Sequence, residues 1–514
     1  RAELDEVYIK ANLFKRSINS PVSLQSIGVA EIEKNPGGNR DVLKVLQSLP
    51  GVASNPGFRN DIIIRGGATS ENKFYVDGIE VPVINHFQTQ GATGGPVGII
   101  NTDLIRNVDF YSSAFPANRG NALSSVIEFT QKKGNRESLE GRATLGTSDA
   151  GITLQGPLSK KTSVIFSARQ SYLQLLFKLI KLPFLPTYND FQFNLNSKLS
   201  DKEELSVFAM AAIDDFELNE GVNDKVTDEE TLKRNNYILS NIPIQTQWNY
   251  TAGASYKHYG ENSKQTYVLS RNEWKNSAIK FFNNTGNAED LLFDYDSKEV
   301  ETKFRFENDT KIKDKIKLNF GFGLQQSQYL NETFQRFTNL ETVQTNDFES
   351  KLSVFSYNLF GQASRSFLSD RLKVSLGVRL DANSYNDEMK NIFNQFSPRL
   401  SASYSFTDKW FLNASLGNYN QLPSYTILGY RDNSNVLVNK ETVAYITSQH
   451  TVGGLEYRPE RNAKITLEGF YKKYDNYPFS ITNQISLANL GADFGVIGNE
   501  AVVSNNEGRA YGFE

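Results

Sequence analysis

Strict alternation of apolar and polar residues is the feature of this sequence that most limits its fold. From Leu372 to Leu380, Leu or Val occupies every second position, and Lys, Ser, Gly and Arg stand between them. Residues 315–325 repeat the pattern with Ile, Leu and Phe. Such alternation gives a strand one face for an apolar environment and one face for water. These segments therefore predict β-strands, either of a membrane barrel or of a soluble sheet protein.

The connections between the alternating segments favour the barrel. Short polar turns occur at 158–162, 199–204, 260–264, 312–315, 368–371, 406–409 and 458–462. Longer irregular stretches occur at 214–243, 328–350, 419–446 and 476–507. Short and long connections thus take turns, as periplasmic turns and outer loops do in outer-membrane barrels. A propeller is the structural rival, but its blades carry four short strands and a recurring signature instead of pairs of strands of about ten residues.

Composition excludes several other classes of protein. The chain has 24 Tyr and 35 Phe, yet hydrophobic residues make up only 39% and the mean hydropathy is -0.46. The most apolar run, 175–186, contains two Lys and two Pro and is shorter than the roughly 18 residues of a membrane helix, so we interpret it as a loop or a packed surface helix. The net charge of -3 gives no basis for a nucleic-acid partner. With no cysteine and three separated histidines, the sequence predicts neither a metal site nor a cofactor.

Residues before about 138 have a different texture. In 41–52, apolar residues recur at helical spacing until Pro50-Gly51 ends the helix. Strand-like runs at 62–65, 73–78 and 126–132 complete a small α/β unit. We divide the chain into a lead-in at 1–20, an α/β domain at 21–138 and a barrel at 139–514, in which no comparable helix is expected.

The barrel segment contains about sixteen strands, fewer than the twenty-two of a plugged transporter. The last alternating run, 508–514, stops in mid-strand. A barrel edge would leave backbone groups unpaired in lipid. At roughly 24 residues per strand, twenty-two strands need about 150 further residues. We therefore expect the sequence to be a fragment that lacks the C-terminal strands.

Four sequence blocks resemble the plug of TonB-dependent outer-membrane receptors, and they stand in the family's order. The blocks are DVLKVLQSLPGV (41–52), NDIIIRGG (60–67), KFYVDGIEVP (73–82) and LIRNVDFYSSAFPANRGNALSSVIEFTQKKG (104–134). Residues 438–460 resemble a barrel strand that follows a long outer loop. The resemblance implies a transmembrane antiparallel β-barrel with an α/β plug in its lumen, in the outer membrane of a Gram-negative bacterium. It also implies active import of a scarce ligand, driven by a TonB-type protein of the inner membrane, and no enzymatic activity.

Three motifs in the plug-like region have physical roles of their own. Arg65-Gly66-Gly67 follows a buried-looking strand, so the glycines permit a sharp turn and the guanidinium can reach carboxylates on the wall. Asp77-Gly78 is a hairpin-turn signal. Arg119-Gly120 fits either a plug-to-barrel contact or an ordinary turn. For each motif the alternative is that it only builds a small domain.

The segment around Leu4, Asp5, Glu6 and Val7 occupies the position of the family's energy-coupling segment. An exposed acidic run followed by a β-branched residue can add as an edge strand to a partner protein. A linker or the first strand of the plug explains the same residues equally well.

Two regions supply candidate ligand contacts. The resemblance places part of the Gly-rich stretch 83–98 near the outer apex of the plug, and the aromatic loop 419–446 can offer platforms for a sugar or a chelate. The candidates are His86, Phe87, Gln88, Gln90, Tyr425, Tyr430 and Arg431. Loop packing and an interfacial aromatic girdle are the alternative for the second region. An acidic cluster between Asp214 and Glu230 can hold a cation, but a solvated loop is the simpler interpretation.

The ligand class stays open at this point. A ferric siderophore or similar chelate is the first hypothesis, and a glycan or peptide taken up with a surface lipoprotein is the second. A passive porin or adhesin would share the barrel and its contact with outer-membrane lipid, but it has no use for a plug of more than about a hundred residues.

Overall fold

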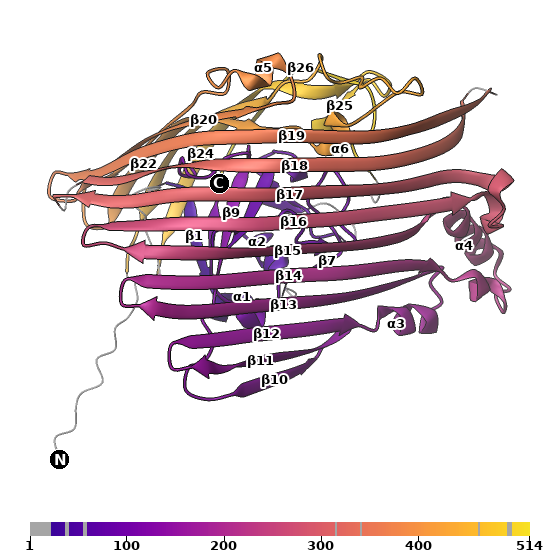
Figure 1. Cartoon of the computed structure of the whole chain (residues 1–514), viewed down its shortest axis with the longest axis horizontal. Coiled ribbons are helices and arrows are strands. Elements are labelled where there is room, and N and C mark those ends of the chain that lie inside the picture. The colour runs from indigo at the N-terminus through magenta and orange to yellow at the C-terminus, as the bar shows by residue number, and fades with distance from the viewer. Residues whose placement is uncertain are drawn as a thin grey trace.

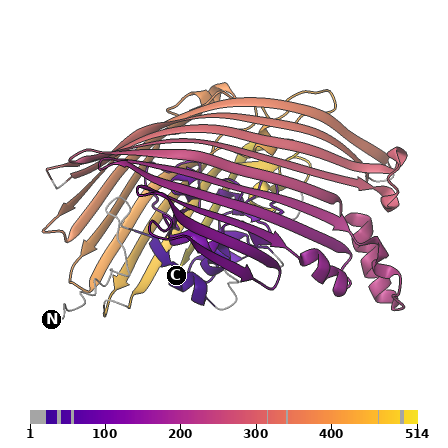
Figure 2. The same ribbon diagram turned by 60° about the horizontal axis from the view of Figure 1, so that its bottom comes forward.

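The computed structural model contains one large antiparallel sheet that curves around a small mixed domain (Figures 1 and 2). We call the small domain the plug and the large sheet the wall. The structure describes residues 22–35, 41–54, 59–313, 316–339, 342–460, 463–490 and 496–514.

A five-stranded sheet with the order β1-β8-β9-β4-β5 forms the plug, and only the β4–β9 pair is parallel. The helix predicted within 41–52 is confirmed as α2, whose N-terminus is capped by the Asp41 side chain, which accepts from Leu43 N at 2.9 Å. The plug elements are β1 (Leu24–Gly28), α1 (Val29–Lys34), α2 (Val42–Leu46), β2 (Val52–Ser54), β3 (Ile62–Ile64), β4 (Asn72–Val76), β5 (Ile79–Glu80), β6 (Asn85–His86), β7 (Val97–Gly98), β8 (Ile105–Tyr111) and β9 (Ser125–Gln131).

The wall is a 17-stranded antiparallel sheet in sequence order. Its strands are β10 (Glu140–Leu145), β11 (Asp149–Ser159), β12 (Thr162–Ser171), β13 (Phe184–Ser200), β14 (Glu203–Leu218), β15 (Ile244–Tyr259), β16 (Ser263–Phe281), β17 (Leu291–Ile312), β18 (Ile316–Asn339), β19 (Thr342–Phe367), β20 (Leu372–Asn383), β21 (Ser397–Ser405), β22 (Trp410–Gln421), β23 (Ile446–Tyr457), β24 (Ile465–Ser480), β25 (Ile485–Ser486) and β26 (Val502–Phe513). Because β25 has only two residues, sixteen long strands remain, which agrees with the predicted number. Over the described ranges the order begins at β10 and ends at β26, and no pairing joins these two strands.

The predicted alternation is confirmed on β20. Leu376 is 55% exposed on the outward face, whereas its neighbour Ser375 is 3% exposed and faces the plug. The outward face therefore presents apolar side chains and the inner face presents polar ones, as a membrane strand around a hydrated lumen requires.

Strands β17, β18 and β19 are much longer than the predicted ten residues, with 22, 24 and 26 residues. The expectation of an irregular loop at 328–350 is wrong, because most of this range continues the hairpin of β18 and β19, from Gln328 opposite Ser353 to Asn339 opposite Thr342. Cross-strand pairing satisfies the backbone groups of both strands without any support from lipid or core. The hairpin is therefore regular far beyond the length that a membrane requires.

The expectation that no comparable helix follows residue 139 is also wrong. Helix α4 (Glu229–Asn241) has 13 residues and lies in a connection, where the Asp228 carboxylate accepts from Thr231 N at 2.8 Å and caps it. Helix α3 (Leu173–Leu179) agrees with the interpretation of 175–186 as a loop or surface helix for its first part, whereas 184–186 already belongs to β13. Two short helices, α5 (Asp387–Lys390) and α6 (Tyr425–Leu428), lie in later connections. None of the helices in the described ranges is long and apolar enough to span a membrane.

The apolar core of the plug extends into the wall. Its buried cluster combines plug residues from β1 to β9 with side chains from two wall strands. The wall contributes Phe208, Met210 and Ala212 from β14 and Val268 and Trp274 from β16. The plug is therefore attached to this part of the wall by apolar packing as well as by polar contacts.

Candidate functional site at the interface of plug and wall

Arg65 projects from the plug to the wall directly after β3. Its backbone φ is 49° and that of Gly66 is 71°, so the chain turns sharply at this point. Arg65 Nη2 donates to Glu468 Oε2 of β24 at 2.5 Å and also to Glu514, and Nη1 donates to Ser113 Oγ at 3.2 Å. The Arg65 side chain has no exposed surface. A buried cation of the plug thus faces two carboxylates at the end of the wall.

The other motif residues lie in turns and close contacts. Asp77 and Gly78 join β4 to β5 with φ of 49° and 85°, the conformation that a two-residue hairpin turn needs. Arg119 Nε donates to Glu128 Oε1 of the plug at 2.5 Å. A Cβ added at Gly120 would lie 2.0 Å from Arg379 Nε of the wall, so a larger residue here would displace the Arg379 side chain. Gly67 packs against Ser124 inside the plug.

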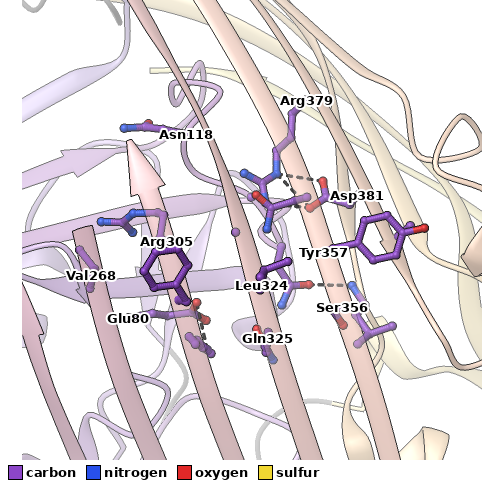
Figure 3. A pocket seen from close by; sticks show the side chains of 18 of the residues that line it. Glu80, Asn118, Val268, Arg305, Leu324, Gln325, Ser356, Tyr357, Arg379 and Asp381 are labelled. Carbon is purple, nitrogen blue, oxygen red and sulfur yellow. Dashed lines mark hydrogen bonds and ion pairs between the residues drawn. The ribbon is translucent and has the colours of Figure 1, made fainter. Parts of the chain in front are cut away.

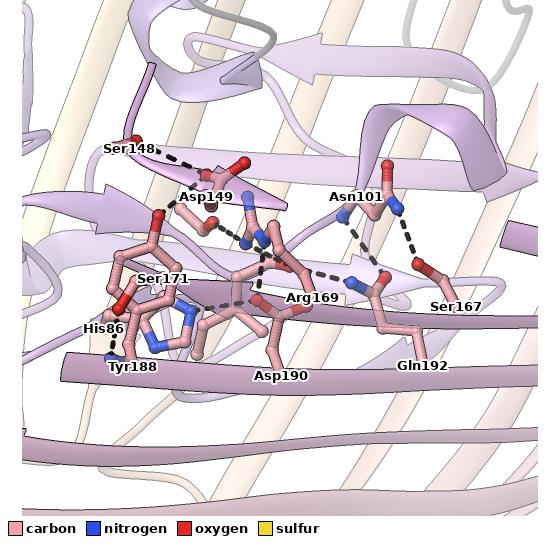
Figure 4. Close-up of polar contacts among 12 residues, drawn as sticks. His86, Asn101, Ser148, Asp149, Ser167, Arg169, Ser171, Tyr188, Asp190 and Gln192 are labelled. Atoms are coloured by element: carbon pink, nitrogen blue, oxygen red, sulfur yellow. Dashed lines mark hydrogen bonds and ion pairs between the residues drawn. The ribbon is translucent and has the colours of Figure 1, made fainter. Parts of the chain in front are cut away.

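His86 is held between two wall carboxylates, of which Figure 4 shows Asp190. Its Nδ1 lies 2.5 Å from Asp214 Oδ1 and its Nε2 lies 3.1 Å from Asp190 Oδ2. The backbone N of Phe87 donates to Asp214 Oδ2 at 2.8 Å, and the imidazole stacks on Tyr188 with 4.2 Å between ring centroids. The arrangement fixes the end of β6 to β13 and β14.

The charges around His86 favour its protonated form. Burial lowers the pKa of His86, but Asp214 and Asp190 outweigh this effect and raise the pKa above its ordinary value. Arg169 of β12 donates to Asp190 Oδ2 at 2.7 Å and shares that carboxylate with the imidazole. In the described part of the chain, no group of three or more His, Asp or Glu is arranged to hold a metal ion.

Gln90 also connects plug and wall, through three neutral side chains and one carboxylate. Its Oε1 accepts from Tyr295 OH and Ser297 Oγ, both at 2.7 Å, and from Asn276 Nδ2 at 3.3 Å. Its Nε2 donates to Glu299 Oε1 at 2.7 Å. A single plug side chain therefore binds four side chains of β16 and β17.

The four candidates between 86 and 90 are buried, with exposed fractions of 0% for His86, 5% for Phe87, 2% for Gln88 and 1% for Gln90. Phe87 packs edge-on against Phe216, and Gln88 Oε1 accepts from the backbone of residue 84. In this conformation these residues connect plug and wall instead of standing exposed at an outer apex. Gln88 is the one that also borders the outer cavity described next.

An outer cavity of about 150 Å³ lies between the plug and the connections at the end of the wall opposite the short turns. Plug residues Thr69, Ser70 and Thr93 line one side, and Trp274 and Tyr425 line the other. Residues with hydroxyl groups and residues with aromatic rings thus line the same space, a combination that suits a polar ligand with flat groups.

The three aromatic-loop candidates lie in different surroundings. Tyr425 belongs to α6, and its hydroxyl donates to Glu301 Oε1 at 2.7 Å at the edge of the outer cavity. Tyr430 packs edge-on against Phe348 with 5.3 Å between ring centroids. Arg431 Nη1 donates to the carbonyl oxygen of Asn435 at 2.7 Å within its own loop. The structure therefore brings only Tyr425 of these three to the outer cavity.

An inner cavity of about 110 Å³ lies deeper between plug and wall (Figure 3). Lys303 donates to Glu80 of the plug at 3.0 Å and Arg379 pairs with Asp381 at 2.7 Å. Arg305 Nη2 donates to the carbonyl oxygen of Gly78 at 2.8 Å. Charged groups of both signs thus surround a space large enough for a few water molecules.

Tyr75 contributes a neutral hydroxyl to the same cavity. Burial, followed by the charge of Glu80, raises the pKa of Tyr75 to about 12, so the group keeps its proton at physiological pH. The Arg119 guanidinium lies 4.7 Å from the centroid of the Tyr75 ring and Nη1 of the same group lies 3.9 Å from Glu307 of the wall. Arg119 is therefore part of a turn and also faces the wall.

The wall partners of the plug were not identified from the sequence. Alternation from 188 to 196 places Asp190 on the inner face, but it does not say which plug residue lies opposite. The interpretation of the acidic cluster as one solvated loop is wrong for Asp214, which is 1% exposed in β14. Leu4, Asp5, Glu6 and Val7 lie outside the described residues.

Comparisons with known proteins agree with this architecture. Residues 187–514 match the family model described as "TonB dependent receptor-like, beta-barrel", and residues 16–126 match "TonB-dependent Receptor Plug Domain". No curated protein matches the chain in sequence.

Solved structures share the fold at low sequence identity. The siderophore receptor PirA from Pseudomonas aeruginosa is 14% identical with a TM-score of 0.65, and the match covers 96% of this chain and 81% of that chain. PirA from Acinetobacter baumannii is 13% identical with a TM-score of 0.66 and coverages of 96% and 77%. A mutant of the ferric enterobactin receptor PfeA from Pseudomonas aeruginosa is 15% identical with a TM-score of 0.66 and the same coverages. The chain belongs to the TonB-dependent receptors, which are non-enzymatic transporters of the Gram-negative outer membrane with a plug inside a β-barrel.

Proposed function

We propose that this transporter imports a ferric siderophore or a similar metal chelate. The observation that carries the proposal is the outer cavity, which is lined by Thr69, Ser70 and Thr93 of the plug together with Trp274 and Tyr425. A chelate presents polar oxygen atoms at its edge and flat groups around its metal, and both find partners there. The solved structures with the same fold include receptors whose titles name siderophores and ferric enterobactin.

The size of the outer cavity limits how such a ligand enters. Its volume of about 150 Å³ is below the roughly 300–1,000 Å³ of a pocket that encloses a drug-sized ligand. Only one edge of a chelate therefore fits between plug and wall, and the remainder contacts the loops above. The proposed energy-coupling segment is the one that contains Leu4, Asp5, Glu6 and Val7.

Uptake by whole cells tests the ligand class. A strain deleted for the gene, and the same strain complemented with it, receive radioactive iron as a catecholate or a hydroxamate chelate, with and without an uncoupler. The proposal expects uptake of at least one chelate that requires both the gene and the proton motive force. Growth of the two strains on single glycans provides the second arm.

A matched pair of variants locates the ligand within the protein. Tyr425→Phe removes the hydroxyl that donates to Glu301 at the cavity edge, and Tyr430→Phe removes a hydroxyl outside the cavity lining. Binding of the active chelate to intact cells weakens in the first variant and stays unchanged in the second. In the growth experiment, a deletion strain that grows poorly only on a glycan would instead support a glycan importer that works with a surface lipoprotein.

A further inference from the structure

The plug does not contact all parts of the wall in the same way. We call the contact with β12–β14 the attached face and the contact with β16–β20 the cavity face. Figure 4 shows part of the first and Figure 3 shows part of the second. The difference between them bears on the path that a ligand takes past the plug.

The attached face combines ion pairs, hydrogen bonds and apolar packing. His86 contacts Asp190 and Asp214, Arg169 Nη2 donates to the carbonyl oxygen of Gly98 at 2.6 Å, and Asn101 Nδ2 donates to Ser167 Oγ at 2.7 Å. Phe208, Met210 and Ala212 of β14 belong to the buried core of the plug. Separating the plug from the wall at this face would expose apolar surface and leave buried charges without partners. Opening here is therefore costly in free energy.

Both cavities lie on the cavity face, and they share residues of their linings. Asn121 of the plug and Leu422 of the wall border the outer cavity and the inner cavity alike. Val268 and Trp274 of β16 pack against the plug core, but the contacts that border the two cavities are mainly hydrogen bonds and ion pairs beside spaces of water size. Water can replace such contacts at small net cost, because polar groups next to a hydrated space find new partners.

Strand β17 connects the two cavities with a row of charged side chains. Alternate residues of a strand share a face, and four consecutive inner positions are occupied by Glu299, Glu301, Lys303 and Arg305. The two carboxylates border the outer cavity and the two cations border the inner one. Among the described residues, Arg305 Nε is buried without a hydrogen-bond partner, and the Glu307 carboxylate with which it forms an ion pair lies 3.7 Å away. A donor for an anionic oxygen atom is thus present at the inner end of the row.

We propose that an imported ligand passes the plug on the cavity face, along the charged row of β17, while the attached face continues to hold the plug to the wall. Arg305 receives anionic oxygen atoms of the ligand in the inner cavity. The inference rests on transport by this family and not on the class of chelate proposed above. It names the side of the plug that opens and the chemistry that the ligand meets there.

Thiol labelling in living cells tests which face opens, and the sequence has no cysteine that would give a background. Ser270→Cys places a thiol on the lining of the inner cavity, and Ser167→Cys places one on the attached face. Both serines are nearly fully buried, with exposed fractions of 4% and 1%. The full-length protein carries each substitution in turn, and a membrane-impermeant maleimide is applied to energised cells, to uncoupled cells and to cells without TonB.

The proposal expects labelling of Ser270→Cys to rise several-fold in energised cells that contain TonB, with no rise for Ser167→Cys. Equal labelling at the two positions, including none at either, or a larger rise at Ser167→Cys would overturn it. Because the measurement needs no ligand, it decides the side of opening even if the chelate proposal fails.

The charge of the labelling reagent tests the role of Arg305. A sulfonate-bearing and an ammonium-bearing methanethiosulfonate are compared on Ser270→Cys, each relative to its rate with a free thiol. The expected preference is for the anionic reagent, because Lys303 lies opposite Ser270 in the β16–β17 pair and Arg305 is the next inner residue of β17. Adding Arg305→Gln reduces that preference. An unchanged preference would show that Arg305 does not take part in the proposed path. The maleimide experiment would then still decide which face opens.

Discussion

Arg65 and His86 are both buried cationic side chains of the plug, and each faces two carboxylates of the wall. Arg65 meets Glu468 and Glu514 near the end of the wall, and His86 meets Asp190 and Asp214 on the attached face. The guanidinium keeps its charge at every physiological pH, whereas an imidazole exchanges its proton near neutrality. The plug is thus held by one pH-independent and one pH-dependent charge contact.

The largest effect is expected from Arg65→Gln. Removing the guanidinium leaves two buried carboxylates without their cation, and breaking a buried pair in this way costs about 3–5 kcal/mol. Amide hydrogen exchange of the plug, measured by mass spectrometry on protein in detergent, reports the loss as faster opening. Arg65→Lys keeps the charge and is the control, with a smaller loss. Equal exchange in Arg65→Gln and the unaltered protein would show that the pair contributes nothing to plug retention.

His86→Leu is expected to lower the free energy of plug opening by a smaller amount, about 2–3 kcal/mol. Asp190 keeps Arg169 as its partner, so only Asp214 is left without a cation, and the Phe87 backbone N still donates to it. The same exchange experiment, read over residues 83–98, measures the effect. His86→Leu combined with Asp214→Leu serves as the control, since removing both partners recovers part of the loss. If the plug amides of the double variant exchanged faster than those of His86→Leu, the pair of His86 and Asp214 would not be the source of the stabilisation.

Replacing Gln90 with Ala is expected to cost about 1–2 kcal/mol. The substitution removes four hydrogen bonds, three of them to neutral groups, and a neutral bond contributes less than a bond to a buried charge. The denaturant midpoint should therefore be lowest for Arg65→Gln, higher for His86→Leu and highest for Gln90→Ala. If Gln90→Ala proved the most damaging, charge would not be the property that separates these contacts.

The smallest effect is a dependence on pH. The folded-state pKa of His86 lies above its ordinary value of 6.5, so its stabilisation is fully present below about pH 6.5 and is lost as pH rises through the folded-state pKa. One proton changes the free energy of opening by at most about 1.4 kcal/mol per pH unit. Protection of plug amides, corrected for the intrinsic exchange rate, should decline with rising pH in the unaltered protein and not in His86→Leu. The same decline in both proteins would exclude His86 as its source.

The sequence predicted the elements of the fold more completely than the contacts of the site. Alternation identified the strand at 372–383, and the helical spacing before Pro50 identified α2, because both are local properties of the chain. The contact of His86 with Asp214 joins residues 128 positions apart, and no local pattern determines which inner position of a curved sheet meets a given plug residue. Charge at a lumen-facing position was the available signal, and Asp190 carried it.

The helix α4 and the long hairpin were missed for a different reason. Polar, acidic composition at 228–241 reads as a solvated loop, yet Asp228 caps a helix whose stability comes largely from local bonds. In the range 328–350 polar residues such as Asn331, Glu332 and Thr333 follow one another and break the apolar alternation. Pairing between the two strands, and not an apolar face, keeps this part of the sheet regular.

The length of that hairpin sets how far the transporter reaches from the cell. A strand of 26 residues is about 85 Å long, and at a tilt of about 45° it rises about 60 Å, roughly 35 Å more than the apolar band of a barrel. The tips of β18 and β19 therefore stand in the carbohydrate layer of the outer leaflet, well above the phosphate groups of the lipid. Diffusing molecules meet a rigid β-ribbon at the height of the surface sugars before they approach the mouth of the barrel.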